Sequence, residues 1–91
     1  MAKGISVFKK AVKLFPNASP YVAGDGMYGA IIEWGRRVIV VTADDGGKIQ
    51  VGNYVRKDWF DGGEPFMYSE ERTIKAALAL VDAWTGGDWV R

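Results

Sequence analysis

The sequence predicts an α+β fold, in which an antiparallel sheet follows one amphipathic helix in the chain and precedes another. Two observations predict it: an apolar period of about 3.6 residues near each end of the chain, and β-rich runs between them that are separated by the turn signals Gly35-Arg36 and Asp45-Gly46. Strands joined by such tight turns pair antiparallel. We expect the order α-β-β-β-α, a sheet of three to four strands packed with two helices, and a single compact domain over residues 1–91.

The first expected helix runs from Ser6 to Phe15. Ser6 is placed as its N-cap, because the hydroxyl can accept a hydrogen bond from a first-turn N–H, and Pro16 ends the helix. One side of this helix is apolar and the opposite side is basic. The basic side carries Lys9, Lys10 and Lys13. We expect these lysines to lie in solvent, or to steer association electrostatically with phosphate, anionic lipid or an acidic protein surface.

The three expected strands are Met27–Trp34, Arg37–Ala43 and Lys48–Val55, and Pro20–Ala23 is a candidate fourth. Two-residue loops at both turns place Trp34 opposite Arg37 and Arg37 opposite Tyr54. Because side chains alternate between faces, one face is expected to form the core. Its members are Ile31, Val38, Val40, Ile49, Val51 and Val55.

The last expected helix begins after Ser69, which is placed as its N-cap, and two glutamates follow in the first turn, where they favour the helix dipole. Its apolar stripe has the spacing i, i+3, i+4, i+7. The stripe consists of Ile74, Ala77, Leu78, Val81 and Trp84. Gly86-Gly87 is expected to end this helix.

The second sheet face mixes aromatic, aliphatic and cationic residues, and Trp, Tyr and Arg are the types enriched at binding hot spots. The candidate partner-binding residues on this face are Tyr28, Trp34, Arg37, Tyr54 and Arg56, and further candidates outside the expected strands and helices are Lys57, Trp59, Phe60 and Trp89. Three interpretations of this mixed face stay open. A helix or residues 59–68 cover it, or it binds a protein, or it binds single-stranded nucleic acid. In the last case bases would stack on the aromatic rings while arginine and lysine track phosphates.

The absence of cysteine and histidine excludes disulfides, thiol nucleophiles, histidine bases and the usual zinc sites. We therefore expect no catalytic residue, no metal site, no cofactor and no enzymatic activity. The net charge of +1 hides an asymmetry: residues 1–57 hold nine Lys/Arg and four Asp/Glu, whereas residues 58–91 hold three and seven. A dipolar chain lacks the uniformly basic balance of a dedicated nucleic-acid binder.

The expected element order resembles that of the double-stranded-RNA-binding domain. Glu70 and Glu71 stand where that family is rich in lysine, so neither residues nor activity are carried over. No apolar run has the length of a membrane span or the form of a secretory signal, and a cytoplasmic protein without membrane contact is expected.

The leading functional interpretation is a small non-catalytic protein-interaction module that occupies the surface of a protein partner. Small tryptophan-rich chains of this kind resemble the accessory inhibitors that phages and mobile elements direct at host proteins. The alternatives are a nucleic-acid-binding module that uses the mixed sheet face, and a homo-oligomeric structural protein that associates through a sheet edge.

Overall fold

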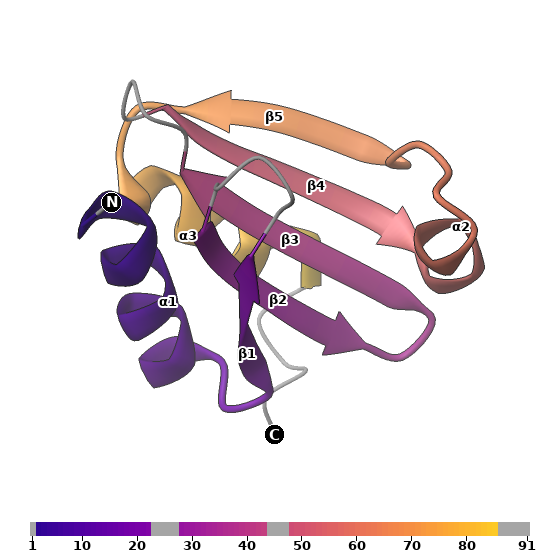
Figure 1. The fold of residues 1–91 in the computed structure, drawn as a ribbon, viewed down its shortest axis with the longest axis horizontal. Helices are drawn as coiled ribbons and strands as arrows, with labels where there is room; N and C mark the ends of the chain where they lie inside the picture. The colour runs from indigo at the N-terminus through magenta and orange to yellow at the C-terminus, as the bar shows by residue number, and fades with distance from the viewer. Residues whose placement is uncertain (1, 23–27, 44–47, 86–91) are drawn as a thin grey trace.

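The computed structural model describes residues 2–22, 28–43 and 48–85, which form a five-stranded antiparallel sheet with three helices (Figure 1). The class is α+β, as predicted. The strands lie in the sheet in chain order, β1-β2-β3-β4-β5, so the sheet is a meander. The elements are α1 (Ala2–Leu14), β1 (Ala18–Val22), β2 (Tyr28–Trp34), β3 (Arg37–Ala43), β4 (Ile49–Val55), α2 (Arg56–Phe60), β5 (Met67–Glu71) and α3 (Ile74–Thr85).

The predicted order α-β-β-β-α and the predicted count of three to four strands match the structure only in part, because a fifth strand and a third helix are present. β1 extends the candidate strand at Pro20 in the N-terminal direction, and β5 occupies residues that were expected to begin the last helix. α2 forms a short third helix directly after β4, in a segment without a clear apolar period. The resemblance to the double-stranded-RNA-binding domain rested on the order α-β-β-β-α alone, and the observed element order does not support it.

α1 begins earlier than predicted, so Ser6 lies inside the helix and is not its N-cap. The predicted end is confirmed, because α1 stops at Leu14 and the Phe15 N–H donates to the Ala11 carbonyl oxygen at 2.7 Å. Pro16 then follows, and proline cannot continue the helical hydrogen bonds.

α3 begins at Ile74, so the predicted cap at Ser69 is wrong. Ser69 lies on β5, where its hydroxyl donates to Glu71 Oε2 at 2.7 Å. The N–H of Ala76 donates instead to Thr73 Oγ1 at 3.1 Å, which makes Thr73 the capping residue. The predicted apolar stripe is confirmed, since its three central members are buried: Ala77, Leu78 and Val81.

The predicted pairing of β2 with β3 is confirmed, with Trp34 opposite Arg37. Gly35 has φ +59°, and no non-glycine residue among those described has a positive φ. A positive φ at the first loop position alone fits the predicted type II′ turn.

The predicted pairing of β3 with β4 is wrong by one residue. Arg37 lies opposite Val55 instead of Tyr54, and Val41 lies opposite Val51. A shift of one residue moves every β4 side chain to the other face of the sheet. The predicted turn at Asp45-Gly46 lies outside the described residues.

This register reverses the predicted core face for half of the sheet. Ile49 and Val51 of β4 share a face with Ile39 and Val41 of β3, and this face, not the one with Val38, packs against the helices. α1 covers β1 to β3, and α3 covers β4 and β5. The core members on the sheet are Ala18, Ala30, Ile32, Ile39, Val41, Ala43, Ile49 and Val51, and those on or directly after the helices are Val7, Ala11, Phe15, Ala77, Leu78 and Val81. None of the described helices has the length and apolar character that crossing a bilayer requires.

Two glycines let the sheet pack tightly. A Cβ built on Gly29 would lie 1.8 Å from the carbonyl oxygen of Val41, so only glycine permits β2 to approach β3 as it does. A Cβ on Gly52 would lie 2.8 Å from the Tyr54 ring, so that ring occupies the space which a side chain would need.

The two glycines predict a graded loss of stability. Gly29→Ala is expected to lower the free energy of unfolding by about 3 kcal/mol or more, because the clash is with backbone. Gly52→Ala is expected to cost about 1–2 kcal/mol, because the Tyr54 ring can rotate away. Urea unfolding of both variants measures the difference, and equal losses would contradict the backbone contact at Gly29.

Candidate interaction surface

The residues predicted to share one mixed sheet face lie on two different faces. Tyr28 and Arg37 lie on the helix-covered face and are half-buried, whereas Tyr54 lies on the opposite face. The predicted stacking platform of Tyr28, Trp34 and Tyr54 is therefore wrong. The side chain of Trp34 and the whole of Trp89 lie outside what the structure describes.

The face opposite α1 and α3 carries a cluster of three aromatic rings. The Trp59 ring of α2 meets the Tyr54 ring edge-on, with centroids 4.8 Å apart, and lies 5.6 Å from the Tyr21 ring. All three side chains are half-buried, and Val38 and Val40 on this sheet face are buried. Trp59 thus covers part of this sheet face, whereas Phe60, Phe66 and Tyr68 of the segment predicted to cover the mixed face are exposed.

Burial raises the pKa of the Tyr54 phenol above its ordinary value of 10.0. The negative charges that the Tyr21 phenolate and the Glu64 carboxylate would place nearby add to this rise. The neutral phenol is therefore the form that the folded chain favours.

Two arginines lie over two exposed phenylalanines at one end of the sheet. The Arg37 guanidinium carbon is 4.6 Å from the centroid of Phe66, and that of Arg56 is 5.5 Å from the centroid of Phe60. Phe60 is 67% exposed and Phe66 is 60% exposed, although both rings are large and apolar. We call these four residues the arginine–phenylalanine end.

Strand ends and α2 place these four side chains. Figure 1 shows α2 beside the end of β4 and the start of β5. The Arg56 N–H donates to the Arg36 carbonyl oxygen at 2.6 Å, which joins α2 to the β2–β3 turn. The Phe66 N–H donates to the Asn53 carbonyl oxygen at 2.7 Å, which fixes the approach to β5. Arg56 also forms an ion pair with Glu33 of β2.

Sequence reasoning predicted three members of this end, Arg37, Arg56 and Phe60. It missed the fourth member, Phe66, and the ion-pair partner of Arg56, Glu33. Phe66 carried one usable signal, because an aromatic residue directly after Pro65 has no obvious place in a periodic element. Lys57, also predicted for binding, lies exposed on α2 beside this end.

A groove of about 650 Å³ lies between α1 and α3. Its apolar lining consists of Leu14, Phe15, Leu78 and Ala79, and its charged lining consists of Lys10, Lys13, Lys75 and Asp82. Two of the three predicted steering lysines therefore border an apolar groove, together with a lysine from α3 that sequence reasoning missed. Lys9 is exposed and is not part of the lining.

A smaller cavity of about 450 Å³ lies beside the arginine–phenylalanine end, and Asn53 and Trp84 contribute to its lining. Asn53 is 1% exposed, and its Oδ1 has no hydrogen-bond partner among the described residues. A buried acceptor without a donor costs about 1–3 kcal/mol.

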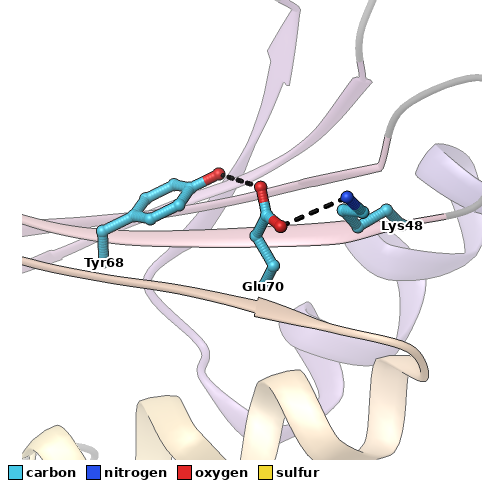
Figure 2. A network of polar contacts seen from close by, with 3 residues as sticks. All are labelled: Lys48, Tyr68 and Glu70. Atoms are coloured by element: carbon cyan, nitrogen blue, oxygen red, sulfur yellow. Dashed lines mark hydrogen bonds and ion pairs between the residues drawn. The ribbon is translucent and has the colours of Figure 1, made fainter.

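A further polar network joins the edge strand β5 to Lys48, which directly precedes β4 (Figure 2). Glu70 of β5 accepts a hydrogen bond from the Tyr68 hydroxyl at 3.0 Å and forms an ion pair with Lys48 at 3.2 Å. All three side chains are exposed, so the ion pair contributes about 0–1 kcal/mol to pairing of β4 with β5.

The described residues contain no group of three acidic, histidine or cysteine side chains placed to hold a metal ion. Two candidate contact surfaces, the arginine–phenylalanine end and the groove between α1 and α3, combine apolar side chains with positive charge. In comparisons with known proteins, no family model, no curated protein and no solved structure matches this chain.

The raised pKa of Tyr54 predicts a loss of stability at high pH. A raised pKa in the folded state means that the contribution of Tyr54 is fully present below pH 10.0 and is lost as pH rises through the folded value. Tyr54→Phe is expected to reduce the fall in urea midpoint between pH 7 and about pH 11. A variant whose midpoint falls as far as that of the unmodified chain would contradict this.

The orphaned amide oxygen of Asn53 predicts a stabilising substitution. Asn53→Val removes the unpaired acceptor and suits a strand, so the free energy of unfolding is expected to rise by about 1 kcal/mol. Thermal or urea unfolding measures this. A loss of similar size would instead mean that the amide group makes a compensating hydrogen bond.

Proposed function

We propose that the chain is a small non-catalytic protein-interaction module, an accessory inhibitor of the phage or mobile-element type, that acts in the cytoplasm by occupying the surface of a host protein. Its main contact surface is the arginine–phenylalanine end. The observation that carries the proposal is the exposure of Phe60 and Phe66, each with a guanidinium over its ring.

Burying an exposed aromatic side chain against a partner favours binding, because apolar surface is removed from water. Completely burying a phenylalanine that was exposed stabilises by about 1.5–3 kcal/mol, and Phe60 and Phe66 both keep more than half of their surface in water. Aromatic residues and arginine are also enriched in protein interfaces, and they are frequent among the few residues that dominate binding energy.

The arginines prepare the two rings for contact. Arg56 is held between the Glu33 carboxylate and the Phe60 ring, and Arg37 lies against Phe66, so neither ring stands alone. A side chain that is already ordered loses less conformational entropy on binding. The planar guanidinium can still donate hydrogen bonds to a partner while it stacks on the ring.

The first test locates the contact in cells of the source organism. A photo-crosslinking amino acid at position 60 or 66 is expected to give one discrete adduct with a protein. The same amino acid at position 72, an exposed residue that directly follows β5 at the opposite end of the strands, is the matched control and is expected to give none. Equal adducts at all three positions, or none at 60 and 66, would contradict the proposal.

The second test uses the captured partner. Phe60→Ala and Phe66→Ala are each expected to weaken its binding by about tenfold or more in calorimetric titration, whereas Arg72→Ala changes it by less than about twofold. Because all three side chains are exposed, the unfolding midpoint is expected to stay within about 0.5 kcal/mol of the unmodified chain. Unchanged affinity in both phenylalanine variants would exclude this surface.

The alternatives are distinguished by two further measurements. Titration with single-stranded DNA and RNA at low salt tests the nucleic-acid interpretation, because binding through phosphates weakens steeply as salt rises. Sedimentation at high protein concentration tests self-association through a sheet edge. A monomer that binds neither nucleic acid leaves the protein-interaction module as the only one of the three functions.

A further inference from the structure

The groove between α1 and α3 has an apolar floor that lies below its rim. Phe15 and Leu78 form the floor and are 2% and 3% exposed, so they are recessed between the two helices. Leu14, on the α1 side, is 57% exposed. Ala79, on the α3 side, is exposed and small, so it leaves room for a large side chain from outside.

The rim of the groove is mainly positive. Lys10 and Lys13 stand on α1 and Lys75 stands on α3, all three exposed, with Asp82 as the one acidic group in the lining. Neither ion pair of the described residues involves these lysines. An occupant with carboxylates along both flanks would therefore be attracted from both sides.

We propose that this groove binds an acidic amphipathic helix of a partner protein. An amphipathic helix places its apolar side chains in a hydrophobic groove with the spacing i, i+3, i+4 and i+7. The eight residues from Lys75 to Asp82 span about 10 Å, which matches about two turns of such a helix. Two neighbouring helices offer a third one the ridge-and-groove packing common in proteins.

The recessed floor disfavours two other occupants. A flat anionic membrane would reach the lysines but not Phe15 and Leu78, which lie between the helices. Single-stranded nucleic acid needs exposed rings for stacking, and the only ring in this lining belongs to the buried Phe15. A helix with leucines on one side and glutamates on both flanks matches both the apolar floor and the positive rim.

The direct test uses a synthetic helix of roughly 18 residues, about five turns, with leucines in an i, i+3, i+4, i+7 stripe and glutamates on the flanks. Fluorescence anisotropy with the full chain is expected to show binding that weakens as salt rises from about 20 to about 300 mM. A peptide of the same composition in scrambled order, and one with lysine in place of glutamate, are expected to bind at least about tenfold more weakly.

Substitutions in the chain assign the binding to the groove. The double variant Lys10→Glu/Lys75→Glu and the single variant Leu14→Asp are each expected to weaken peptide binding by about tenfold or more. Lys57→Glu and Ile5→Asp are the matched controls, because they change an exposed lysine and an exposed apolar residue outside the groove, and they are expected to have less than about a twofold effect. Circular dichroism checks that all four variants keep their fold.

Three outcomes would overturn the inference: no preference for the amphipathic peptide over the scrambled one, equal effects of groove and control variants, or stronger binding to vesicles of anionic lipid than to the peptide. The inference stands on residues other than those of the proposed function. Phe60→Ala/Phe66→Ala is expected to bind the peptide normally, so failure at the groove and failure at the arginine–phenylalanine end are separate results.

Discussion

The register between β3 and β4 is the constraint on which the rest of the structure depends. Val41 lies opposite Val51, so Ile39 and Val41 of β3 point to the same side as Ile49 and Val51 of β4, the side that α1 and α3 cover. A shift by one residue would turn Gln50 and Lys48 toward the helices and would leave a charged group in the core. Burying apolar surface is the dominant favourable term in folding, and here it selects one register out of two.

The same register also determines which β4 side chains lie on the sheet face opposite α1 and α3. It places Gly52 and Tyr54 away from the helices, where the glycine leaves space for the tyrosine ring and Trp59 of α2 covers that ring. One face of the sheet is then covered by α1 and α3, and part of the other face is covered by aromatic side chains. A chain of 91 residues needs most of its large side chains for such packing. The two candidate contact surfaces therefore lie at one end of the sheet and between α1 and α3.

Local patterns predict the elements whose signals are local. The apolar stripe of α3 and the glycine turn at Gly35 depend on neighbours in sequence, and both are confirmed. The cap at Ser69 failed although Ser-Glu-Glu is a good helix start, because pairing of β5 with β4 overrides it. The prediction of which β3 and β4 side chains share a face was wrong, because it depends on whether the connection from β3 to β4 has an even or an odd number of residues. In the candidate site, Arg37, Arg56 and Phe60 were predicted singly, but their contacts with Phe66 and Glu33 arise only from tertiary packing.

The two candidate surfaces differ in chemistry in a way that follows from their cations. At the end of the sheet the cations are arginines, which stack on rings and keep fixed hydrogen-bond geometry, so this surface suits one oriented contact. Beside the groove they are lysines, which are flexible point charges and suit attraction at a distance. Six of the nine basic residues in the positive half of the chain belong to or adjoin these two surfaces: Lys10, Lys13, Arg36, Arg37, Arg56 and Lys57. The fold therefore places most of the basic residues of the positive half of the chain at one end of the sheet and beside the groove between α1 and α3.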